Sequence, residues 1–114
     1  MGDDGIAKAT LHHIGEITEY IPNSVFTKTI IKKPTGNISV ISFDAGSGVV
    51  GEVYPFDTFL LLLEGQAEVI IDKKSNKLSA FQGIIIPAHS KYILTAIARF
   101  KMLSVTIKSG YKEG

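Results

Sequence analysis

Period-two patterning in several short segments constrains the fold of this chain more than any other feature of its sequence. In residues 67–72, Ala67, Val69 and Ile71 alternate with Glu68, Ile70 and Asp72, and residues 38–44 alternate between two sets in the same way. Successive side chains of a β-strand point to opposite faces of a sheet, so both segments are predicted to be strands. Two further β-rich runs, residues 92–97 and 100–108, follow Pro87, which cannot donate a hydrogen bond to a neighbouring strand.

Turn-forming residues separate these segments at short intervals. The segment 64–66, with the sequence EGQ, stands between two apolar runs and predicts a hairpin. Residues 72–78, with the sequence DKKSNKL, predict a second turn through Ser75 and Asn76. Residues 7–20 have the length for a short helix, but the irregular spacing of their apolar residues favours strand and loop. About eight strands are expected in all, which predicts an all-β sandwich or barrel.

Composition narrows the range of functions. A chain of 114 residues has room for one domain, so residues 1–114 are expected to share a single core. Twelve basic against 11 acidic residues, with a net charge of +1, argue against nucleic acid as a partner. The sequence has no apolar segment of about 18 residues and no secretory pattern, so no membrane association is expected. With no cysteine there is neither a disulfide nor thiol chemistry, and a cytoplasmic location is expected.

Three short motifs, taken in order, resemble the small single-domain cupins. They are Leu63-Glu64-Gly65 with the strand after it, Ile86-Pro87-Ala88, and Phe100-Lys101-Met102-Leu103. The resemblance implies a double-stranded β-helix, the cupin jelly-roll barrel, with its core at about residues 38–108 and with residues 1–37 adding strands and loop. It does not imply one activity, because this scaffold hosts isomerases, dioxygenases, sugar-binding sensors and storage proteins.

The residues at the family's metal-ligand positions differ from those of metal-binding cupins. The first motif of the family is similar to H-x-H-x-x-x-E, and counting back from the turn glycine Gly65 places Glu52, Tyr54 and Thr58 at these positions. The second motif has a histidine five residues after the proline, where this chain has Tyr92. Imidazole holds transition metals well, whereas a phenol must first lose a proton, so no metal cofactor is expected. The alternative is a hard ion held by the oxygen atoms of Glu52, Tyr54 and Tyr92, with His89 as a fourth ligand.

The resemblance places the expected site inside the barrel. If Glu52 and Tyr54 lie on one strand they share a face, which the resemblance implies to be the pocket wall, with Tyr92 opposite. Asp57 and His89 are further candidates near the mouth of the pocket. A carboxylate and two phenols suit a small polar ligand. If these residues have only a structural role, Glu52 and Asp57 are solvated loop residues, and Tyr54 and Tyr92 fill the barrel.

Two functional hypotheses follow. The first is a metal-free protein that binds a small molecule in its barrel. The second is an enzyme of the isomerase or epimerase type, in which Glu52 acts as a general acid or base and Tyr54 or Tyr92 is the proton donor. A homodimer is expected in either case, because residues 59–63 and 84–86 are apolar at successive positions and therefore need cover on both faces.

Overall fold

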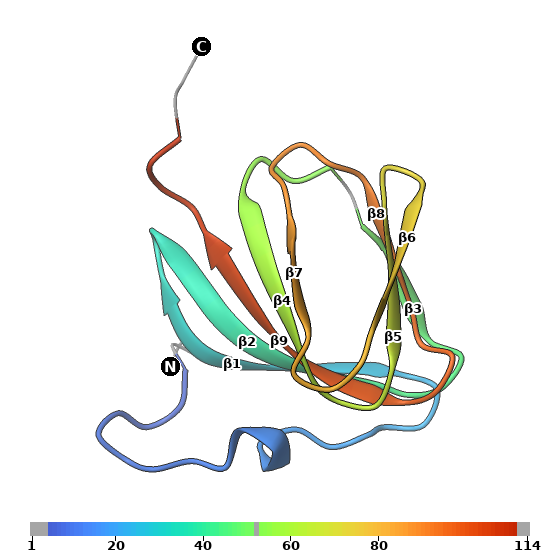
Figure 1. Cartoon of the computed structure of the whole chain (residues 1–114). Coiled ribbons are helices and arrows are strands. Elements are labelled where there is room, and N and C mark those ends of the chain that lie inside the picture. The colour runs from blue at the N-terminus through green and yellow to red at the C-terminus, as the bar shows by residue number, and fades with distance from the viewer. Residues whose placement is uncertain (1–4, 52, 112–114) are drawn as a thin grey trace.

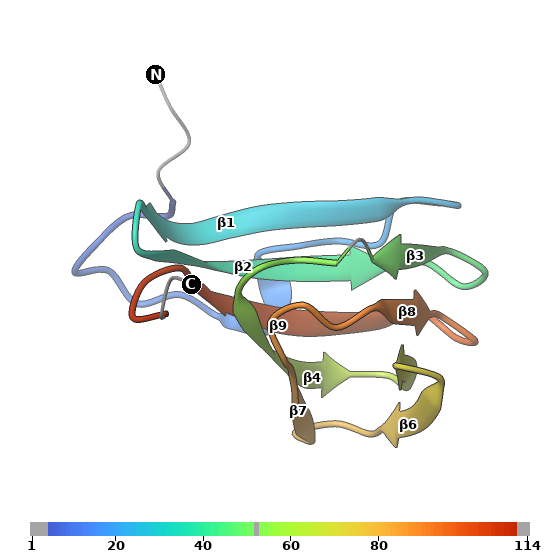
Figure 2. The ribbon, with the colours of Figure 1, turned by 90° about the horizontal axis from the view of Figure 1, so that it is seen from above.

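Nine strands are present in the computed structural model, which describes residues 5–51 and 53–111. They are β1 (Val25–Lys33), β2 (Gly36–Phe43), β3 (Gly48–Gly51), β4 (Asp57–Glu64), β5 (Ala67–Ile71), β6 (Lys74–Leu78), β7 (Gly83–Ile86), β8 (Tyr92–Thr95) and β9 (Phe100–Ile107). One sheet has the order β1-β2-β9-β4-β7 and the other the order β3-β8-β5-β6, and every pair of neighbours is antiparallel. The two sheets face each other as the walls of a barrel (Figure 1), which confirms the all-β prediction. Figure 2 shows β1, β2 and β9 side by side in the larger sheet.

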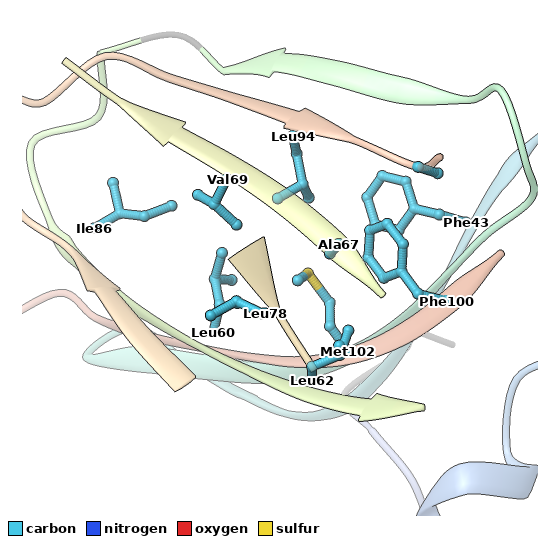
Figure 3. Close-up of a cluster of buried hydrophobic side chains, with 11 residues drawn as sticks. Phe43, Leu60, Leu62, Ala67, Val69, Leu78, Ile86, Leu94, Phe100 and Met102 are labelled. Carbon is cyan, nitrogen blue, oxygen red and sulfur yellow. The ribbon is translucent and has the colours of Figure 1, made fainter. Parts of the chain in front are cut away.

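The core lies between the sheets, and the alternation of side chains along each strand explains which residues enter it. Phe43 of β2 and Phe100 of β9 are almost fully buried, and their rings stack with centroids 4.5 Å apart. Leu60, Leu62 and Met102 approach from the larger sheet and Val69 and Leu94 from the smaller one (Figure 3). Burial of large apolar side chains such as these is the main source of stability in a domain of this size.

The segment from residue 5 to the start of β1 runs along the outside of the larger sheet, as Figure 1 shows. It contains a single turn of 3-10 helix, η1 (Ile14–Glu16), where strand and loop were expected. Lys101 of β9 is 8% exposed, and its Nζ donates to the carbonyl oxygens of Gly15 at 2.6 Å and Thr18 at 2.9 Å. This buried ammonium group therefore ties the N-terminal segment to the sheet. No helix in the described part of the chain has the length and apolar character needed to span a membrane.

The hairpin predicted at EGQ was wrong, and the turn predicted within residues 72–78 lies at the start of that segment and not at Ser75 and Asn76. Strand β4 pairs with β7 and β9 and β5 pairs with β6 and β8, so the EGQ segment crosses from one sheet to the other and makes no hairpin. The crossing places Leu62 and Ala67, on either side of it, in the same core. The second turn lies at Asp72 and Lys73, which both have positive φ, at 47° and 73°. Such two-residue turns match the twist of the flanking strands, and Ser75 and Asn76 consequently lie within β6.

An apolar row crosses the outer face of the larger sheet. Its members occupy directly opposed positions on all five strands, namely Ile31, Ile38, Val105, Phe59 and Ile85. Towards one edge the row is open, since Phe59 is 38% exposed and Ile85 is 60% exposed. Apolar side chains in a contiguous row of this kind are typical of surfaces that pack against another protein.

Candidate ligand-binding site

A cavity of about 390 Å³ lies between the two sheets, and its lining includes residues of the β3–β4 and β7–β8 loops. Figure 1 shows these two loops at the same end of the barrel. The cavity is lined by Val49, Gly51, Tyr54, Phe56, Thr58, Ile86, Pro87, Ser90, Tyr92, Ser104 and Thr106. Six of these side chains carry a hydroxyl group and the others are apolar or glycine. A volume of this size is within the range of pockets that hold small organic molecules.

The floor of this cavity consists of hydroxyl groups from two neighbouring strands. Thr58 of β4 and Thr106 of β9 are paired across the strands, and their Oγ1 atoms lie 3.3 Å apart. Ser104 is the next residue of β9 on the same face. A second hollow of about 220 Å³ shares Thr58, Ser104 and Tyr92 with the first and continues towards Phe43 and Met102. The site therefore becomes more apolar with depth.

Tyr92 is positioned by a close approach to the backbone of β3. It pairs with Gly51 on the adjacent strand, and a Cβ atom at Gly51 would overlap the Tyr92 ring. Glycine at this position lets the ring lie flat against β3, where a larger residue would push it away. Burial raises the pKa of the Tyr92 phenol, so the hydroxyl stays protonated at neutral pH and is available as a hydrogen-bond donor.

The structure separates the site residues that the sequence suggested. Tyr54 and Tyr92 line the same cavity. Glu52 lies outside the described residues. Since β3 ends at Gly51 and β4 begins at Asp57, Tyr54 belongs to a loop, and strand alternation does not determine where its side chain points.

Asp57 and His89 are close to the mouth but do not line the cavity. Asp57 faces outward from β4, and its Oδ1 accepts a hydrogen bond from the backbone N–H of Ala88 at 2.7 Å. The side chain of His89 is exposed, its φ is 67°, and its backbone N–H donates to the carbonyl oxygen of Tyr54 at 2.7 Å. Both residues thus connect the two loops around the cavity.

Sequence reasoning missed most of the hydroxyl groups in the cavity. Ser90, Ser104 and Thr106 were not site candidates, and Thr58 was considered only as a replaced metal ligand. The alternation along β9 carried a signal, because Phe100 and Met102 are followed on the same face by Ser104 and Thr106. A strand face that changes from apolar to hydroxyl-bearing residues indicates the point where the core gives way to a cavity.

The residues present do not fit the transition metal of the metal-binding cupins. The matching positions in the described chain are Tyr54, Thr58 and Tyr92, which offer only hydroxyl oxygen atoms. Burial disfavours the phenolate of Tyr92, the form that would bind a metal strongly. Over residues 5–51 and 53–111, no three His, Asp or Glu side chains are grouped so that they could share a metal ion.

Comparisons with solved structures support the barrel architecture. A conserved protein of unknown function from Streptococcus pyogenes is 25% identical, with a TM-score of 0.86 and 94% of each chain covered. A cupin superfamily protein from Desulfitobacterium hafniense is 27% identical, with a TM-score of 0.82 over 93% of this chain and 96% of that one.

A cupin 2 conserved barrel domain protein from Leptotrichia buccalis is 18% identical, with a TM-score of 0.88 over 99% of this chain and 59% of that one. No protein-family model matches the sequence. No curated protein matches it either. The chain has the cupin fold, a double-stranded β-helix that forms a barrel around an internal cavity.

Proposed function

We propose that the protein binds a small, uncharged organic molecule in the barrel cavity, through hydroxyl groups and without a transition metal. The observation that carries this proposal is one cavity of about 390 Å³ whose lining combines six hydroxyl-bearing side chains with apolar residues. Hydroxyl groups both donate and accept hydrogen bonds, so they suit alcohol, amide or carbonyl groups of a neutral ligand. A cytoplasmic location and a homodimer, both expected from the sequence, remain part of this proposal.

The residues around the cavity favour a ligand without charge. No charged side chain is among its described lining residues, and Asp57, which is close by, is directed to the backbone of Ala88. An ion without a partner in a partly buried site loses hydration that nothing replaces. An uncharged ligand avoids this cost.

Binding is favoured over acid–base catalysis because of the state of Tyr92. The raised pKa of its phenol makes it a hydrogen-bond donor at neutral pH and a weak proton donor. An isomerase or epimerase needs groups that exchange protons near neutral pH, and the raised pKa of Tyr92 makes it a poor partner for Glu52 in such a reaction.

A set of three probes of the same shape but different charge tests the proposal. Benzyl alcohol, benzoate and benzylammonium share one ring and differ in the group that meets the hydroxyl floor. We expect benzyl alcohol to bind at least about tenfold more tightly than either ion, a difference of about 1.4 kcal/mol. Titration calorimetry or ligand-observed NMR measures the three dissociation constants.

Two variants make the result specific. Thr106→Val removes a floor hydroxyl with little change in volume and should weaken benzyl alcohol by roughly fivefold to tenfold, about one hydrogen bond. Glu52→Gln should leave the order of the three probes unchanged. If benzylammonium binds best to the wild type and loses this advantage in Glu52→Gln, then Glu52 is part of the site and the ligand carries positive charge. If none of the three binds, the proposed function is wrong.

A further inference from the structure

We infer that Asp57 and Tyr111 are positioning residues that hold the mouth of the cavity in its binding shape, although neither lines the cavity. The inference rests on the proposed function. It assigns a role to the last described residue of the chain, which lies well away in sequence from the loops that it contacts.

Tyr111 fixes the β3–β4 loop at the residue where β4 begins. Its hydroxyl group accepts a hydrogen bond from the backbone N–H of Asp57 at 2.7 Å and donates one to the carbonyl oxygen of Ile107 at 2.6 Å. One phenol therefore joins the start of β4 to the end of β9. Because it uses its donor and its acceptor together, phenylalanine cannot replace it.

The ring of Tyr111 also supports a wall of the cavity. It packs against Phe56 with centroids 5.7 Å apart, and Phe56 makes an edge contact with Tyr54 at 5.1 Å. Both Phe56 and Tyr54 line the cavity. A shift of Tyr111 would therefore be passed through two aromatic contacts to side chains that meet the ligand.

Asp57 connects this loop to the one on the other side of the mouth. Its Oδ1 accepts a hydrogen bond from the backbone N–H of Ala88. In the sequence, Asp57 directly follows the loop residues Tyr54, Pro55 and Phe56. The carbonyl oxygen of Tyr54 in turn accepts from the His89 N–H. Two hydrogen bonds of 2.7 Å thus join the β3–β4 loop to the β7–β8 loop, which supplies Pro87 and Ser90 to the lining.

The contacts form one connected set: Ile107 to Tyr111, Tyr111 to Asp57, and Asp57 to Ala88. It explains why an acid and a tyrosine stand at positions that face away from the cavity. Loops held by several such bonds lose less freedom when a ligand binds, which improves affinity without any contact to the ligand.

The test compares four variants of the whole protein. Tyr111→Phe keeps the ring and removes the hydroxyl, and Tyr20→Phe is its matched control, because Tyr20 donates a 2.7 Å hydrogen bond to Glu64 away from the mouth. Asp57→Ala removes the acceptor for Ala88, whereas Asp57→Asn keeps an acceptor oxygen and should rescue the function. The measured quantities are the dissociation constant of benzyl alcohol and the exchange rates of the Asp57, Ala88 and His89 amides.

We expect Tyr111→Phe and Asp57→Ala to weaken benzyl alcohol at least threefold. The Asp57 amide should exchange at least tenfold faster in the first variant, and the Ala88 amide in the second. Tyr20→Phe and Asp57→Asn should match the wild type in both measurements, even if their melting temperatures fall as far.

Equal dissociation constants for Tyr111→Phe and Tyr20→Phe would overturn the inference. So would unchanged amide exchange in Tyr111→Phe and Asp57→Ala. If the wild type fails to bind benzyl alcohol, the proposed function fails, and the exchange rates alone decide whether these two residues hold the loops.

Discussion

Replacement of Gly51 by alanine tests the packing that shapes the cavity. The added Cβ would overlap three atoms of the Tyr92 ring, and no other atom is closer to it. Crowding of this kind typically costs about 1–3 kcal/mol. The φ of Gly51 is not in the left-handed region, so alanine is otherwise tolerated and should stabilise the chain by about 0.4–1 kcal/mol through the unfolded state.

The two effects separate when Tyr92 is also changed. In the wild type, Gly51→Ala should lower the free energy of unfolding by roughly 1–2 kcal/mol, because the crowding exceeds the backbone gain. In a Tyr92→Leu background the overlap is gone, and the same change should be neutral or stabilising. The coupling energy between the two positions is therefore expected to be about 2 kcal/mol.

Urea unfolding of the four proteins, followed by circular dichroism, measures this double-mutant cycle without any ligand. A loss of the same size in both backgrounds would show that Tyr92 does not lie against Gly51. Stabilisation of the wild type by Gly51→Ala would contradict the packing as well.

Three other predictions concern the N-terminal segment, the outer face and the response to alkali. Lys101→Met keeps the apolar part of the side chain but removes the hydrogen bonds to Gly15 and Thr18, so the free energy of unfolding should fall by about 3 kcal/mol in urea titrations. A loss below about 1 kcal/mol would contradict the role of this lysine. The exposed part of the apolar row should pack against the same row of a second copy, so light scattering at micromolar concentration should find a dimer. Ile85→Glu should raise the dissociation constant of this dimer at least about tenfold, and a monomeric wild type would refute the prediction. Burial raises the pKa of Tyr92 from 10.0, so the stability due to its neutral phenol is complete below pH 10 and is lost as the pH rises through the raised pKa. Tyr92→Phe should therefore reduce the loss of unfolding free energy above pH 10. An unchanged dependence on pH would contradict the burial of Tyr92.

The sequence predicted the fold well because its information on strands is local. The alternation in residues 67–72 and the effect of Pro87 on a strand depend on neighbouring residues alone. In the structure, residues 67–71 of this segment form β5 and Pro87 directly follows the last residue of β7. The second turn was expected at Ser75 and Asn76 and not at Asp72 and Lys73, because aspartate followed by lysine is a weaker turn signal than serine followed by asparagine. Only the pairing of β5 with β6 decides between them.

The site was harder to predict, since it depends on contacts between distant parts of the chain. Tyr54 and Tyr92 were predicted to face one pocket from the order of motifs around Gly65 and Pro87, and both line the cavity. The role of Asp57 depends on the strand face on which β4 begins after Pro55, and no local pattern determines this. Tyr111 could not be found at all, because its contact with Asp57 spans 54 positions in sequence.

The most direct test of the central claim is to find which methyl groups of the protein contact benzyl alcohol. Isotope-filtered NOE spectra report such contacts, and methyl groups are available both in the cavity and on the outside of the smaller sheet. Binding inside the barrel predicts contacts to Val49, Thr58, Ile86 and Thr106, which line the cavity. Contacts to Ile70 and Ile93 instead, which line a groove of about 370 Å³ with Lys73 and Lys91, would place the ligand outside the barrel and contradict the proposed function.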